Sequence, residues 1–123
     1  MSHIVSIRTE VRDREAVERA CRRLELPEPV DGEAKVFATW KKGLLVRLKD
    51  WEFPIVCDLT SGKLEYDNFQ SHWGDPERLS DFLQIYAVEK ATLEARKKGY
   101  SVVEQPLPNG SIKLVIVVAG EGR

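Results

Sequence analysis

The segment that precedes the second predicted helix carries the densest group of side chains able to bind a ligand. Tyr66, Asp67 and Trp73 supply a phenol, a carboxylate and an indole close together. They lead to Asp75, the expected N-cap of the helix, whose free backbone N–H groups favour anions. Such a segment is typical of a pocket for a small molecule or a nucleotide phosphate. The alternative is that its aromatic rings only cover the edge of the core.

A second pair of polar groups lies on the helix itself. Lys90 falls on the apolar stripe of this helix, one turn from the hydroxyl of Tyr86. A partly desolvated amine with a lowered pKa could bind an anion or act as a base. Alternatively, its four-carbon stem covers apolar surface while the ammonium reaches water. With the three loop residues, these two complete the candidate binding site, and we assign no residue a catalytic role.

Two further patterns carry weaker signals. Cys57 lies beside Asp58 and could act as a nucleophile only if an imidazole met it in space, and His3 and His72 are the two available. His3 could also bind Cu(II) or Ni(II) together with the chain's amino terminus, although removal of the initiator methionine would shorten this motif. The apolar neighbours of Cys57 favour an inert thiol. The sequence therefore predicts that Cys21 and Cys57 are reduced core thiols, with no metal site and no cofactor.

The composition is that of an ordinary folded chain. Hydrophobic residues make up 42% and charged residues 32%, and 19 basic against 20 acidic side chains give a net charge of −1. A nucleic-acid binder usually has a basic excess, so this balance disfavours that function. No apolar stretch is long enough for a signal peptide or a membrane span. We therefore expect one cytoplasmic α+β domain over residues 1–123, without membrane contact.

The periodicity of apolar residues predicts the element order β-α-β-β-β-β-α-β-β. Short strands with brief connections favour antiparallel pairing, and we expect a mainly antiparallel sheet with both helices packed on one face. We expect a hairpin turn at Lys41-Lys42-Gly43, and a last strand that is covered on both faces. The expected strands cover 4–11, 34–40, 44–49, 54–58, 63–69, 101–105 and 111–119, and the expected helices cover 13–26 and 76–98.

The second helix has more apolar circumference than one stripe. Ile85 and Val88 lie off the main stripe, so the first half of the helix is apolar around much of its girth. This predicts contact on two sides, with its own sheet and with another element or a partner. Ile85 and Val88 are thus the candidate interface residues. The stripe itself consists of Leu79, Phe82, Leu83, Tyr86 and Leu93.

Three segments of the chain form a distinctive combination. The opening Met1-Ser2-His3-Ile4 leads into a strand, and Tyr66-Asp67-Asn68 precedes Trp73-Gly74-Asp75. The helix with Tyr86-Ala87-Val88-Glu89-Lys90 runs on to Gly99 and a final hairpin. Over nearly its whole length the chain resembles the Ycf thirty-five family, a domain of unknown function from cyanobacteria, some plastids and other bacteria. The resemblance transfers no catalytic residues, and it implies an accessory or assembly role near an ATPase.

These observations predict a non-catalytic interaction or accessory domain that associates with itself or with a protein partner such as an ATPase. The absence of assembled catalytic groups favours this interpretation over an enzyme. The alternative is a small-molecule or nucleotide-phosphate binding domain with a pocket near Tyr66, Trp73 and Lys90. Such a domain could also be an enzyme. Convergence of the candidate residues in one cavity would favour the alternative, and their dispersal would favour the partner.

Overall fold

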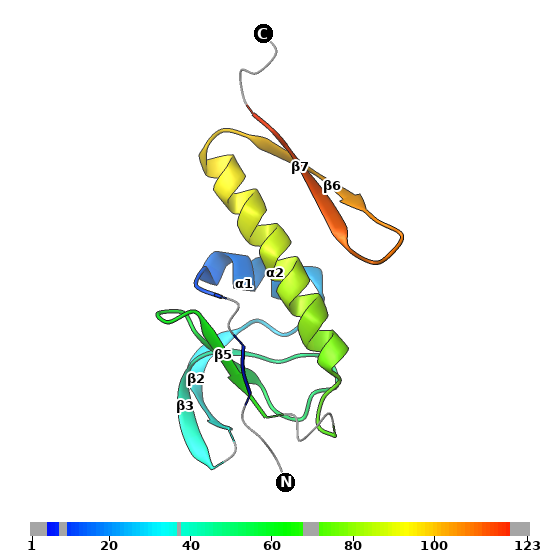
Figure 1. The fold of residues 1–123 in the computed structure, drawn as a ribbon. Helices are drawn as coiled ribbons and strands as arrows, with labels where there is room; N and C mark the ends of the chain where they lie inside the picture. Colours follow the sequence, from blue (N-terminus) through cyan, green and yellow to red (C-terminus); the bar gives the residue numbers. More distant parts are fainter. Residues whose placement is uncertain (1–4, 8–9, 37, 68–71, 119–123) are drawn as a thin grey trace.

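Nine elements follow one another in the predicted order. The computed structural model describes residues 5–7, 10–36, 38–67 and 72–118, and the side chains only from residue 10 onward. The two helices, seven strands and their order confirm the predicted α+β fold (Figure 1). The elements are β1 (Val5–Ile7), α1 (Arg14–Arg23), β2 (Val30–Val36), β3 (Thr39–Val46), β4 (Ile55–Asp58), β5 (Lys63–Tyr66), α2 (Pro76–Lys97), β6 (Ser101–Pro106) and β7 (Ile112–Val117).

Local side-chain chemistry explains where the helices start and stop. The Asp13 carboxylate accepts a hydrogen bond from the backbone N–H of Ala16, and Asp75 caps α2 in the same way through the N–H of Glu77. Each cap satisfies an N–H that the helix leaves without a partner. Pro76 suits the first turn of α2 because its missing N–H would be unpaired there in any case.

The first five strands form one antiparallel sheet in the order β1-β5-β4-β3-β2. Both helices cover the same face of this sheet, as predicted (Figure 1). The main core lies between the helices and the sheet. A small second cluster lies on the opposite face, because neighbouring strand residues point to opposite sides. The main core contains Val17, Ala20 and Cys21 from α1, Leu79, Phe82, Tyr86 and Leu93 from α2, and Leu44, Val46, Ile55, Cys57 and Leu64 from the sheet.

The turn predicted at Lys41-Lys42-Gly43 is wrong. These residues lie inside β3, and Gly43 is paired directly with Gly32 of β2. A glycine within a strand can mark a close approach of two backbones as well as a turn. Here a β-carbon on Gly43 would lie 2.5 Å from the carbonyl oxygen of Cys57 on β4, so the glycine permits close packing of neighbouring strands.

The last two strands form a separate two-stranded sheet and do not extend the first one. The 22-residue helix α2 spans about 33 Å, and it carries the β6–β7 hairpin at its carboxyl-terminal end, away from the five-stranded sheet (Figure 1). The prediction that the last strand is covered on both faces is wrong, since Ile116 and Val117 are 48% and 50% exposed. Within the described residues, no helix is both long enough and apolar enough to cross a membrane.

Candidate functional site

The predicted binding residues fall into two groups with different surroundings. Tyr66 and Trp73 belong to the first group, where the ring centroid of Tyr66 lies 5.4 Å from that of Trp51 and Trp73 lies 5.2 Å from Phe53, both edge to face. The indole N–H of Trp51 donates to the carbonyl of Asp75 at 3.0 Å. These contacts join the segment before α2 to the loop after β3, which is the structural role weighed above for the aromatic rings.

Asp67 and Tyr66 are both buried, at 5% and 8% exposure. Burial raises the pKa of the Tyr66 phenol, so this hydroxyl stays protonated at neutral pH. Neither side chain lines the cavities described below.

Tyr86 and Lys90 form the second group, at the amino-terminal end of α1. The Tyr86 hydroxyl accepts hydrogen bonds from the backbone N–H groups of Arg12 and Asp13, both at 3.1 Å. The Lys90 ammonium lies 3.2 Å from a carboxylate oxygen of Glu94 and 3.7 Å from one of Asp13. The hydrogen bond to Glu94 is the main cause that raises the pKa of Lys90. The interpretation of Lys90 as a base with a lowered pKa is therefore wrong, and the pair joins the two helices.

Replacing Tyr86 with phenylalanine should lower the free energy of unfolding by about 1 kcal/mol, because two partly buried N–H groups lose the hydroxyl that accepts their hydrogen bonds. The matched variant Lys90→Met keeps the apolar stem and removes ion pairs in which the ammonium itself is exposed, so its effect should stay below about 0.5 kcal/mol. Urea denaturation of the two variants measures the difference. Equal losses in both variants would contradict this assignment.

Within the described residues, neither cysteine has the exposed, activated thiol that a nucleophile requires. Cys21 and Cys57 are free thiols with no exposed surface, as predicted. Burial raises the pKa of Cys21 to about 11 and of Cys57 to about 12, so both are protonated at neutral pH. Asp58 instead accepts a hydrogen bond from the backbone N–H of Thr60 in the turn after β4, at 3.0 Å. His3 lies outside the described residues, which contain no group of three metal-binding side chains.

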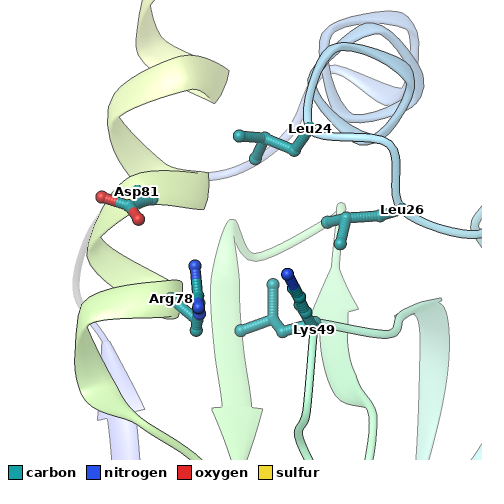
Figure 2. Close-up of a pocket in the computed structure, with 6 residues that line it drawn as sticks. Leu24, Leu26, Lys49, Arg78 and Asp81 are labelled. Carbon is teal, nitrogen blue, oxygen red and sulfur yellow. The ribbon is translucent and has the colours of Figure 1, made fainter.

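A groove that the sequence did not predict lies between the end of α1, the loop after β3 and the start of α2. We call it the cationic groove. Its part beside α2 has a volume of about 60 Å³ and the adjoining part beside Trp51 about 540 Å³. In Figure 2, Lys49 and Arg78 lie side by side below Leu24 and Leu26. The described lining residues are Leu24, Glu25, Leu26, Pro27, Arg47, Leu48, Lys49, Trp51, Arg78 and Asp81.

No local sequence signal identifies the cationic groove, because its residues come from three distant segments. Arg47 and Lys49 lie in the loop after β3 and Arg78 in the first turn of α2, where exposed basic residues are ordinary. Only the packing of α1 and α2 on the same face of the sheet brings Leu26, Lys49 and Arg78 together.

The exposed apolar surface of the second sheet is a further candidate site. Val103 pairs with Val115 across the hairpin, and Val117 lies on the same face two residues along. We call these three residues the valine face, and Val103 and Val117 are each 50% exposed. The opposite face lies against the helices, where Glu104 pairs with Arg23 and Ile116 lines a hollow beside α2.

The candidate interface residues on α2 are less exposed than the sequence suggested. Val88 is only 4% exposed within a single chain, and Ile85 is half-buried against the main core. The chain itself therefore covers most of the additional apolar surface of α2. Exposed apolar side chains lie on the hairpin that follows, at Val103, Ile116 and Val117, and also on the first sheet, at Val30 and Trp40.

Comparison of the chain with family models, with curated proteins and with solved structures finds no significant match.

Proposed function

We propose that the protein is a non-catalytic docking domain that associates with a second copy of itself through the valine face. The observation that carries this proposal is the exposure of Val103 and Val117 on a sheet of only two strands. A two-stranded sheet is marginally stable in water unless another surface packs on it. One face of this sheet lies against the helices, and the valine face has no cover within the described chain.

The charges around the valine face favour a second copy over a charged partner. Lys113 is the one charged residue among those paired on this face, opposite Gln105 near the loop end of the hairpin. Ser101 and Val117 form the other end. In a two-fold arrangement with antiparallel strands, the lysines of the two copies lie at opposite ends of the contact, so they do not repel each other closely.

Ion pairs hold the hairpin in place before any partner arrives. Arg23 of α1 contacts a carboxylate oxygen of Glu89 on α2 at 3.0 Å and one of Glu104 on β6 at 2.9 Å. The hydrogen bonds from Arg23 lower the pKa of Glu104, which keeps this carboxylate charged at neutral pH. A surface that is already ordered loses less conformational entropy on binding.

The test is the mass of the protein in solution, measured by light scattering after size-exclusion chromatography over a range of concentrations. The wild-type chain should form a dimer, and the double variant V103T/V115T should weaken dimerisation about a hundredfold, because threonine keeps the β-branched shape but adds a polar hydroxyl. The matched control is V30T, the same change at a 57% exposed position on β2. It should leave the dimer intact.

Two results would reject this proposal. One is a wild-type chain that stays monomeric at its highest soluble concentration, and the other is a V30T variant that dissociates as readily as V103T/V115T. The resemblance to the Ycf thirty-five family adds an accessory role beside an ATPase to the proposal. Only the three sequence segments that resemble this family support that role. Copurification with an ATPase from the native host would test it.

A further inference from the structure

We infer that the cationic groove binds a small carboxylate with a hydrocarbon body. The inference combines two independent features of the groove, its apolar lining and its cations without partners. It concerns a different surface from the valine face, so it does not depend on the proposed self-association.

The apolar lining comes from leucines that the core holds in position. Leu48 is 5% exposed and belongs to the main core, and Leu24 and Leu26 pack against that core from the end of α1. The backbone N–H of Leu26 donates to the carbonyl of Cys21 at 2.8 Å, which turns the chain back over the helix end. These contacts fix the lining in the absence of a ligand, so little ordering is required on binding.

The cations of the groove differ from the arginines that precede Leu24 in the chain. Arg22 and Arg23 each have a carboxylate within ion-pair distance. In contrast, Arg47, Lys49 and Arg78 have no ion-pair partner among the described residues, and all three line the groove. The lining carboxylates, Glu25 and Asp81, leave an excess of one positive charge. The groove therefore favours an anion.

The combination of these features selects the class of ligand. A guanidinium can donate two parallel hydrogen bonds to a carboxylate, and the ammonium of Lys49 can add a third from the facing side (Figure 2). An inorganic anion would gain nothing from the leucines, and a neutral hydrocarbon would gain nothing from the cations. The part beside α2, at about 60 Å³, has room only for a small group, while the wider part at about 540 Å³ accommodates the rest of the molecule.

The experiment compares three probes by calorimetry and by amide chemical shifts of the full-length protein. Octanoate should bind and shift the amides of Leu24, Leu26 and Arg78. Octanol, which lacks the charge, and acetate, which lacks the hydrocarbon, should each bind at least about tenfold more weakly. Arg78→Gln and Lys49→Gln should each weaken octanoate binding by about tenfold.

Lys97→Gln is the matched control, because Lys97 is an exposed cation at the far end of the same helix as Arg78. It should leave octanoate binding unchanged, and thermal unfolding of all three variants should match that of the wild type because each replaced side chain is exposed. Equal affinity for octanol and octanoate would overturn the inference. Equal effects of Arg78→Gln and Lys97→Gln, or shifts confined to β6 and β7, would also overturn it.

Discussion

Replacing Gly43 with alanine should lower the free energy of unfolding by about 3 kcal/mol, at the upper end for an overpacked interior. A β-carbon at this position would lie 2.5 Å from the Cys57 carbonyl oxygen and 3.0 Å from a methyl group of Val56. The nearest of these atoms belongs to the backbone of β4, so no side-chain rotation relieves the contact. The strands β3 and β4 must separate, and they lie in the middle of the five-stranded sheet.

Gly32 provides the control for this prediction. It is paired directly with Gly43 in the β2–β3 ladder, but a β-carbon there would meet only the flexible end of the Leu45 side chain, at 3.3 Å. Gly32→Ala should therefore change the free energy of unfolding by less than about 1 kcal/mol. Urea denaturation of both variants measures the difference. Similar losses in the two variants would show that the close approach at Gly43 does not limit packing.

Raising the pH above 9 should destabilise the protein through its two buried thiols. Their pKa values rise from 9.0 to about 11 for Cys21 and about 12 for Cys57, chiefly because burial disfavours the thiolate. At a pH between 9.0 and these raised values, the thiols of the unfolded chain release their protons while those of the folded chain keep them. The stabilisation is fully present below pH 9 and is lost as the pH rises to about 11 and 12.

The size of this effect follows from proton linkage. Each thiol should contribute a slope of up to about 1.4 kcal/mol per pH unit in the free energy of unfolding. Urea denaturation at several pH values from 8 upward, for the wild type and for C21A/C57A, isolates the contribution of the thiols from that of lysine and tyrosine side chains. The variant should start less stable, because it loses buried volume, but it should lose less stability with rising pH. Parallel pH profiles would contradict the assignment.

Gly43 and Cys57 belong to the five-stranded sheet and Cys21 belongs to α1, and these elements position the proposed surfaces. The cationic groove is lined by residues from the end of α1, the loop after β3 and the start of α2. The helix α2 also carries the β6–β7 hairpin away from the five-stranded sheet (Figure 1). A loss of stability in this body should therefore weaken octanoate binding and self-association together. Substitutions in the groove or on the valine face should affect only one of them.

The sequence alone determined the features that depend on neighbouring residues. Asp13 and Asp75 predicted both helix starts correctly, because a capping carboxylate acts on N–H groups two or three residues away. The order of the elements followed from local periodicity in the same way. The two reduced, buried thiols followed from the apolar residues around Cys57 and from the absence of a paired cysteine motif.

Only the tertiary structure decided which surfaces meet. Gly43 carries the same glycine signal in a turn and in a close-packed strand, and the pairing with β2 and β4 selects the second. Val88 is covered while Val117 is exposed, although both lie in apolar stretches, because coverage depends on where the hairpin sits relative to α2. The cationic groove likewise joins three distant segments. Contacts between residues far apart in the chain leave no local pattern, and so the geometry of both proposed surfaces became visible only in the folded chain.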